Sequence, residues 1–290
     1  MSEQIEQLVQ QMCLIRHTET ALLELFSQGK VRGTVHTCLG QEACAVGVVS
    51  ALNKETDIIY SNHRGHGHYL AYSQDVYGLI AEILGLPAGI CHGVGGSQHL
   101  QFNNFYTNGI QGAGVPITVG MALAEKLKGS SAIAVPFIGD GTFGEGAIYE
   151  AFNIAALWQA PVMFVVEFNH YAQSTPSLMQ HAGDLRTRVD TYGIPVTVID
   201  GMDVCKVKAA AAIVAEYVRA GKGPAMLFLE TYRLGPHSKG DDDRLQSEID
   251  RYRLRDPLVV CRQLMSQAVF ERIEKDAASQ VSSVIKELLA

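Results

Sequence analysis

The sequence Gly139-Asp140-Gly141-Thr142-Phe143-Gly144-Glu145-Gly146 has four glycines in eight residues. It follows a short apolar run at 133–138 and precedes a segment with helical spacing at 146–158. A glycine-rich turn between a strand and a helix exposes backbone amides, and the dipole of the helix favours an anion at that end. The stretch therefore predicts a phosphate-binding turn at the carboxyl end of a strand. The alternative is a tight strand-to-helix turn that binds nothing.

The chain around this turn alternates between strands and helices. Strands are predicted at 161–166, 197–199 and 225–230, and a helix at 204–220 precedes the last of them. These strands are apolar throughout, as expected when helices cover both faces of a parallel sheet. A short strand is predicted at 57–60, and helices at 5–28, 41–53, 116–128 and in the amphipathic tail 256–289. With no internal repeat and no linker, we expect one α/β domain over residues 1–290, with helical extensions at both ends.

Composition excludes several classes of protein. The 290 residues are 47% hydrophobic and 18% charged, which excludes intrinsic disorder. No apolar run reaches the ~18 residues of a membrane span, and a net charge of −7 argues against a nucleic-acid binder. The six cysteines form no C-x-x-C pair, which excludes a zinc ribbon and predicts reduced, mostly buried thiols. The polar, acidic N-terminal sequence predicts a cytoplasmic protein.

Two oxygen-bearing side chains follow consecutive strands. Asp140 comes after the run 133–138, and Asn169 comes shortly after the strand 161–166. A carboxylate repels a phosphate unless a divalent cation lies between them. Because the carboxyl ends of parallel strands meet at one edge of the sheet, we expect the two side chains to be neighbours. The sequence therefore predicts that they share one magnesium ion.

The motif Gly139-Asp140-Gly141, followed by Asn169 about one helix and one strand later, resembles the thiamine diphosphate motif. Further stretches narrow the resemblance to one family, the alpha subunit of the decarboxylating component of 2-oxo acid dehydrogenase complexes. These stretches are Arg32–His36, Gly40–Ala43, His63–His68, Gly95–His99, Asn108–Gly112, Glu150–Trp158, Tyr171–Pro176 and Thr231–Arg233 with His237-Ser238. The pyruvate, branched-chain and acetoin branches share most of them. The resemblance implies the thiamine diphosphate-binding fold, in the half that holds the diphosphate.

The resemblance also implies a role for each matching residue. Asp140, Asn169 and the backbone carbonyl of Tyr171 would hold magnesium, which bridges the diphosphate oxygens. A guanidinium such as that of Arg64 suits a diphosphate through its planar fork. The implied cofactor-binding residues are His63, Arg64, Gly109, Gln111, Gly139, Asp140, Gly141, Thr142, Asn169, Tyr171 and His237. The implied catalytic residues are His36 and His237, the latter near the diphosphate and the reactive thiazolium carbon.

The activity implied is that of a thiamine diphosphate-dependent oxidoreductase. It would decarboxylate a 2-oxo acid such as pyruvate and pass the acyl unit to an acceptor such as lipoamide. A separate beta subunit would supply the pyrimidine-binding half and the activating glutamate in a heterotetramer, with a lipoyl acyltransferase core as a further candidate partner. The alternatives are an acyloin-forming or acyl-transferring carboligase, a split transketolase-like enzyme, and a non-catalytic partner subunit. A dinucleotide cofactor is disfavoured because no G-x-G-x-x-G follows an early strand.

Other polar residues have structural alternatives. The cluster His63, His66 and His68 could form a metal site, whereas His66 and His68 could equally be hydrogen-bonded loop histidines. Arg64 and His237 could be solvated surface residues. The acidic run 241–243 is expected to be a solvated loop, and Ser238 falls where some relatives are phosphorylated.

Overall fold

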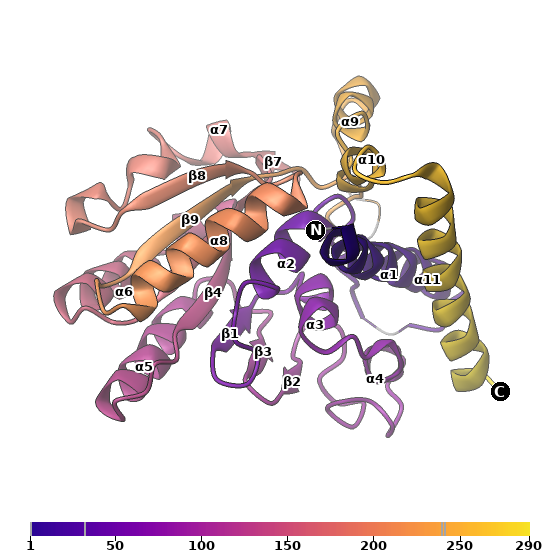
Figure 1. Ribbon diagram of the computed structural model, residues 1–290, viewed down its shortest axis with the longest axis horizontal. Coiled ribbons are helices and arrows are strands. Elements are labelled where there is room, and N and C mark those ends of the chain that lie inside the picture. The colour runs from indigo at the N-terminus through magenta and orange to yellow at the C-terminus, as the bar shows by residue number, and fades with distance from the viewer. Residues whose placement is uncertain (1, 32, 239, 241) are drawn as a thin grey trace.

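A seven-stranded sheet forms the centre of the protein (Figure 1). The structure, a computed structural model, describes residues 2–31, 33–238, 240 and 242–290. The order of strands is β2 (Gln101–Phe102), β3 (Phe105–Thr107), β1 (Ile58–Ser61), β4 (Ala134–Gly139), β5 (Met163–Phe168), β9 (Ala225–Glu230) and β8 (Val196–Asp200). Every neighbouring pair is parallel except β2 with β3. The predicted α/β class with a parallel sheet is confirmed.

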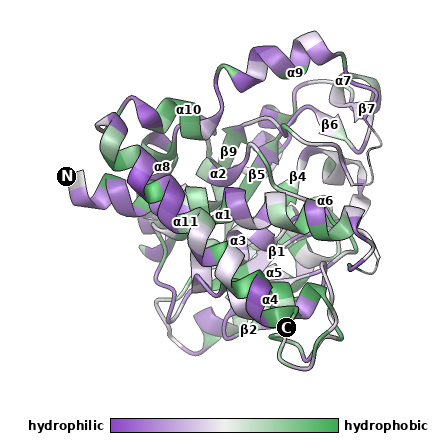
Figure 2. Ribbon diagram, turned by 90° about the vertical axis from the view of Figure 1, so that its right-hand side faces the viewer, coloured by the Kyte–Doolittle hydropathy of each residue, from purple (hydrophilic) through white to green (hydrophobic). Residues whose placement is uncertain are grey.

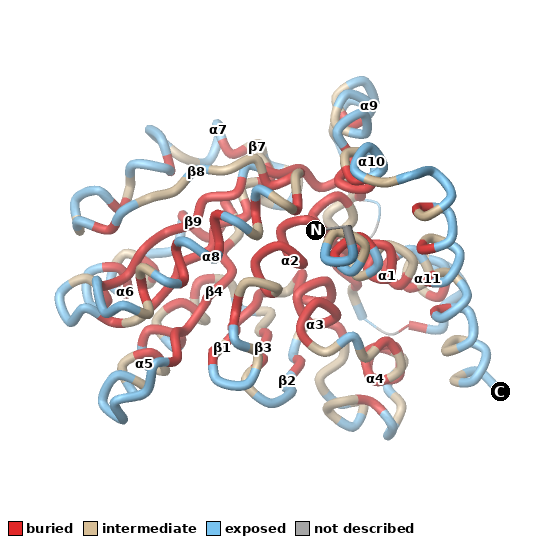
Figure 3. The backbone as a smooth tube through the Cα atoms, viewed as in Figure 1, coloured by how far each residue is buried: buried red, intermediate tan, exposed pale blue. Residues whose placement is uncertain are grey.

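Helices cover both faces of this sheet, and alternate side chains of its central strands enter two separate apolar cores. On β4, Val135 and Phe137 join the core beneath α1 (Ser2–Ser27), α2 (Glu42–Val49) and α8 (Val204–Arg219). Ala134 and Ile138 join the other core, beneath α5 (Gly114–Leu127) and α6 (Gly146–Leu157). Figure 3 shows that the central strands are buried along their length. Burial on both faces explains why these strands carry no polar alternation.

The glycine- and histidine-rich region at 61–99 is more regular than its composition indicates. It contains α3 (His66–Ser73) and α4 (Val76–Ile83), which were not predicted. Gln74 adopts a left-handed conformation with φ of 58° between the two helices. The Asp75 side chain then caps α4 by accepting a hydrogen bond from the Gly78 amide at 2.8 Å. His66 and His68, expected in a loop, therefore lie on a helix.

The turn predicted to bind phosphate and the tail also differ from expectation. A 3₁₀ turn, η1 (Asp140–Gly144), separates β4 from α6, so the glycine-rich stretch does not open the α-helix directly. The tail divides into α10 (Pro257–Arg262) and α11 (Gln267–Leu288), and α9 (Gln246–Arg253) precedes them. Asp256 caps α10 and binds Arg16 of α1 through two bonds of 2.9 Å.

The remaining short elements are the hairpin β6 (Tyr171–Ala172) and β7 (Thr175–Pro176), helix α7 (Ser177–Gln180), and the 3₁₀ turns η2 (Leu185–Thr187) and η3 (Asp190–Tyr192). All six cysteines are free thiols, and four of them are buried, as predicted. None of the described helices is long and apolar enough to span a membrane.

A buried carboxylate, that of Asp57, joins three elements at the amino end of the sheet. It accepts backbone hydrogen bonds from Asn53 at 2.8 Å and from Ile133 at 3.0 Å, just before β4. It also pairs with Arg219, at the end of α8, through contacts of 2.9 and 2.7 Å. Removing it would leave the amides of Asn53 and Ile133 without this acceptor and would leave Arg219 with only the Ser131 carbonyl among its acceptors in the described residues.

We predict that Asp57→Ala lowers the free energy of unfolding by about 3 kcal/mol, because breaking one side of a buried ion pair strands its partners. Urea unfolding of both proteins measures the difference. Asp184→Ala is the matched control, since Asp184 pairs with Arg186 at the exposed surface. This substitution should lower the free energy of unfolding by less than ~1 kcal/mol. Equal losses in the two variants would contradict the role of Asp57.

Candidate active site

A cavity of about 420 Å³ lies beyond the carboxyl ends of the central strands. Its walls come from the segments that follow β1, β3, β4, β5 and β9, which is where ligands bind in open α/β sheets. All the residues that the motifs indicated line it, namely His36, His63, Arg64, Gly109, Gln111, Gly139, Asp140, Gly141, Thr142, Asn169, Tyr171 and His237. The volume falls in the range of small-molecule sites.

Asp140 and Asn169 meet at one edge of this cavity. β4 and β5 are hydrogen-bonded neighbours, with Gly139 opposite Glu167, so the residues just beyond the strands lie together. Asp140 is 1% exposed and accepts hydrogen bonds from the Ser177 hydroxyl and, at 3.1 Å, from the Gly141 amide. Burial raises its pKa, although both hydrogen bonds oppose that shift. The edge thus presents a buried carboxylate that makes no ion pair with any described residue.

Local backbone geometry presents the other oxygens. The Asn169 Oδ1 atom accepts the Tyr171 amide at 3.1 Å, which fixes the orientation of its carboxamide. His170, between them, adopts a left-handed φ of 72°. A side chain at Gly141 would approach the Ala172 Cβ atom to 2.7 Å, so only glycine lets the turn pack against this loop.

Arg64 supplies positive charge to the same cavity. Its guanidinium is buried, donates to the Thr37 carbonyl at 2.5 Å and pairs with no described carboxylate. Burial is the main cause that lowers the pKa of Arg64. A buried cation of this kind is stabilised by an anionic ligand. Arg64 is therefore not a solvated surface arginine.

His237 contacts two guanidinium groups. Its Nδ1 atom lies 3.3 Å from Arg64 Nη2 and 3.2 Å from Arg233 Nη1. Both guanidiniums can only donate, so Nδ1 is an acceptor and the neutral ring carries its proton on Nε2. A protonated ring would direct an N–H at two other donors. The geometry favours His237 as a neutral hydrogen-bond donor and disfavours it as a cation.

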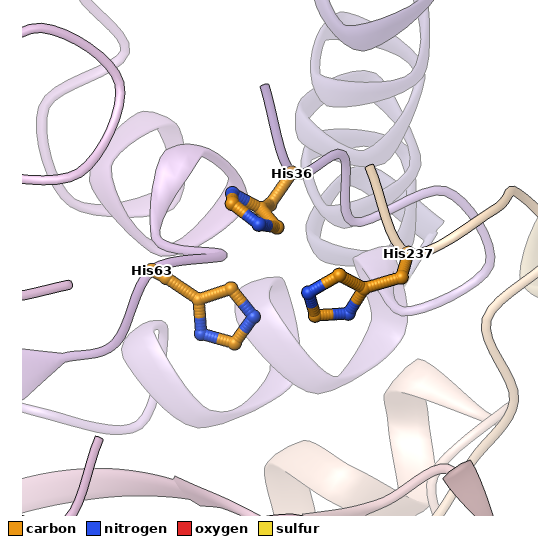
Figure 4. A group of neighbouring side chains, drawn as sticks. All are labelled: His36, His63 and His237. Carbon is orange, nitrogen blue, oxygen red and sulfur yellow. The ribbon is translucent and has the colours of Figure 1, made fainter. Parts of the chain in front are cut away.

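Three imidazoles, those of His36, His63 and His237, face one another in the cavity (Figure 4). The ring centroid of His36 lies 4.6 Å from that of His63 and 4.8 Å from that of His237. One ligand atom of each lies within 4.8 Å of the others, a spacing that a transition metal could bridge. The two guanidiniums beside His237 repel a dication and occupy its Nδ1 lone pair, so we do not assign a metal there.

The predicted alternative cluster of His63, His66 and His68 does not form. His66 is buried between Glu19, at 3.1 Å from its Nδ1, and Ser97, at 2.9 Å from its Nε2. His68 lies between the Ser61 hydroxyl at 2.8 Å and Glu167 at 3.3 Å. Both are hydrogen-bonded core histidines. Arg32 and Asp241, which belong to two stretches discussed above, lie outside the described residues.

Several lining residues were not singled out from the sequence: Gln41, Asn62, Gln98, Glu145, Glu167, Ala172, Gln173, Gln180 and Arg233. Some of them lie inside the family motifs, and their position there could have indicated that they line the site. Ser177, which donates to Asp140, comes from α7, and nothing in its local sequence indicates that contact.

The pH dependence of stability tests the electrostatics of this cavity. Burial, Arg64 and the neighbouring histidines hold the pKa of His63 well below 6.5, and Gln111 opposes them only slightly. Below pH 6.5 the unfolded chain binds a proton that the folded chain excludes, so stability falls as pH falls. We predict that His63→Asn makes this slope shallower by up to about 1.4 kcal/mol per pH unit.

Urea unfolding between pH 5.5 and 7.5 measures these slopes. His92→Asn is the matched control, because His92 is exposed outside the cavity and should leave the slope unchanged. A wild-type slope in the His63 variant would contradict the assignment.

Comparison with known proteins gives the family. Residues 10–290 match the dehydrogenase E1 component family. The alpha subunit of the pyruvate dehydrogenase E1 component of Zymomonas mobilis is 41% identical over 249 residues, which cover 84% of this chain and 70% of the relative. The corresponding subunit of Rhizobium meliloti is 36% identical over 287 residues, covering 97% and 82%. The alpha subunit of acetoin:2,6-dichlorophenolindophenol oxidoreductase of Bacillus subtilis is 40% identical over 246 residues, covering 83% and 74%. The chain therefore belongs to the dehydrogenase E1 component family, whose cofactor is thiamine diphosphate.

Proposed function

We propose that this chain is the alpha subunit of a two-chain enzyme that decarboxylates a 2-oxo acid of the pyruvate type. The acyl unit would pass to an acceptor such as lipoamide. One observation carries the proposal: residues from eight separate motifs converge on a single cavity beyond the carboxyl ends of the sheet. Thiamine diphosphate and magnesium are the proposed occupants.

The residues of the cavity fit a diphosphate bridged to a cation. Arg64 is a buried guanidinium that pairs with no described carboxylate, as an anion-binding group should be. Asp140 is a buried carboxylate that makes no ion pair with any described residue, and Asn169 lies beside it. Carboxylate, amide and carbonyl oxygens are the ligands that magnesium takes from proteins. We assign Asp140, Asn169 and the Tyr171 carbonyl to the metal, and Arg64 with the Gly141 and Thr142 amides to the diphosphate.

The chain's histidines would act beside the reacting atoms. Thiamine diphosphate supplies the carbon nucleophile and takes up the electrons released with carbon dioxide. His237, with its proton on Nε2, would donate to a developing oxygen on substrate or acceptor. His36, 7% exposed and in contact with that ring, would face the same space. His63 and Gln111, with the Gly109 backbone, would line the cofactor side.

A beta subunit would complete the site. The proposed activating glutamate and pyrimidine-binding half belong to it. Exposed apolar side chains close to Asp140 support such docking, because a partner would cover them. Leu178 and Met179 of α7 are 95% and 79% exposed. The same short helix holds Asp140 through Ser177. A lipoyl acyltransferase core is the proposed destination of the acyl unit.

Acetoin is the second candidate substrate. The observation that favours it is the 40% identity to the acetoin:2,6-dichlorophenolindophenol oxidoreductase subunit, close to the 41% identity to the pyruvate dehydrogenase subunit. Parallel assays of pyruvate and acetoin with the assembled enzyme distinguish the two.

We predict that Asp140→Ala abolishes the magnesium dependence of thiamine diphosphate binding. Removing a residue that only hydrogen-bonds to a metal ligand lowers affinity roughly 10–100-fold. Asp140 is proposed as a direct ligand, so its removal should lower affinity further. Calorimetry of the alpha–beta assembly measures it. Asp190→Ala, at an exposed site outside the cavity, is the control. Unchanged, magnesium-dependent affinity in the Asp140 variant would contradict the metal assignment.

We predict that His237→Ala slows acyl transfer to the acceptor by ~100- to 10,000-fold, the range for lost general acid catalysis. Decarboxylation followed with an artificial electron acceptor should fall much less, because the cofactor carries most of that step. Both half-reactions are assayed side by side at saturating cofactor. Equal losses would reduce His237 to a positioning role, and no loss would exclude it from the site.

A further inference from the structure

We infer that Glu248 is a positioning residue that locks together the loop of Asn169 and the loop of His237. The inference rests on the proposed function, since it concerns how two loops are held. We call them the metal loop (169–173) and the histidine loop (231–237). Glu248 lies on α9, which stands out from the body of the protein and is mostly hydrophilic (Figure 2). It does not line the cavity that holds the proposed cofactor.

The carboxylate of Glu248 accepts hydrogen bonds from two tyrosines on different loops. The Tyr171 hydroxyl lies 2.9 Å from both of its oxygens, and the Tyr232 hydroxyl lies 2.9 Å from Oε1. Tyr171 immediately follows the Asn169–His170 turn, and Tyr232 begins the segment that leads to His237. One carboxylate therefore contacts both segments that bring polar groups to the cavity.

Arg244 encloses this contact from the other side. Its guanidinium lies 5.5 Å from the ring centroid of Tyr171 and 4.9 Å from that of Tyr232. It also donates to the carbonyls of Arg233 and Gly235 at 2.5 and 2.6 Å, so it binds the backbone of the His237 segment. Its side chain is 2% exposed. Glu248 and Arg244 thus place opposite charges around the same two rings.

Two further contacts complete the assembly. Tyr252 of α9 stacks on Tyr232 with ring centroids 3.7 Å apart and planes at 2°. Arg233 donates to the Gln173 carbonyl at 3.0 Å, which joins the two loops directly beside the cavity. Only Ile249 of α9 is buried, so apolar packing alone holds this helix weakly. The hydrogen bonds of Glu248 therefore join α9 to both loops, beside the stacking of Tyr252 on Tyr232.

The hydrogen bonds of Glu248 to the two loops can be removed one at a time by substitution. Tyr171→Phe removes the bond to the metal loop, Tyr232→Phe removes the bond to the histidine loop, and Glu248→Gln weakens both while keeping the side-chain size. Asp250→Asn is the matched control, because it makes the same acid-to-amide change two residues along α9 at an exposed site bonded to Gln246 and Arg253.

Amide hydrogen exchange of the full chain is the first measurement. We expect Glu248→Gln to speed exchange at least about tenfold in both 171–173 and 232–237, as lost bonds to a charged group allow local opening. Asp250→Asn should change neither segment. Tyr171→Phe should affect mainly the first segment and Tyr232→Phe mainly the second. Unchanged exchange in Glu248→Gln, or equal loosening of both segments by each tyrosine variant, would overturn the inference.

Ligand binding by the alpha–beta assembly is the second measurement. Glu248→Gln should weaken magnesium-dependent thiamine diphosphate binding about tenfold relative to Asp250→Asn, and saturating cofactor should restore decarboxylation measured with an artificial electron acceptor. A loss of decarboxylation that saturating cofactor does not restore would contradict a positioning role. If the unaltered assembly binds no cofactor, the proposed function fails, whereas the exchange result still decides whether Glu248 links the loops.

Discussion

The parallel pairing of β4 with β5 is the constraint on which the rest of the site depends. Its register sets Gly139 opposite Glu167, so Asp140 and Asn169 leave the sheet at the same edge. Because β1, β3 and β9 run in the same direction, the segments of His63, Gly109 and Arg233 also end there. Sheet direction thus gathers residues that are far apart in the chain around one cavity.

Charge is the second organising element of the cavity. Arg64 and Asp140 are both buried, and each shows the pKa shift of a charge removed from water: that of Arg64 is lowered and that of Asp140 is raised. Neither makes an ion pair with a described residue, so the folded chain bears a desolvation cost that an anion and a cation together would offset. A cation-bridged diphosphate has the required charges. The guanidinium of Arg64, which suits the diphosphate, and that of Arg233 both contact His237 Nδ1 and favour a neutral ring there.

The strands β1, β4, β5, β8 and β9 could be predicted from apolar runs, and the predicted site residues from the glycine turn and the resemblance to a family, whereas β2, β3 and the other lining residues were missed. The helix at His66–Ser73 could not, since glycines and histidines carry no apolar periodicity, and partners distant in the chain, Glu19 and Glu167, are what hold those histidines. The same applies to Ser177 and to Glu248, whose partners lie 37 and 77 residues away in the chain. Contacts of this kind depend on the tertiary fold and produce no recognisable spacing of residues along the sequence.

We propose that the edge formed by β4 and β5 binds the metal that carries the diphosphate. Manganese can replace magnesium in crystals of the alpha–beta assembly grown with thiamine diphosphate, and anomalous X-ray scattering then locates it. We expect one strong peak within bonding distance of the side-chain oxygens of Asp140 and Asn169 and of the Tyr171 carbonyl, with diphosphate oxygens completing its coordination. A peak among His36, His63 and His237, or an empty Asp140 edge beside bound cofactor, would contradict it.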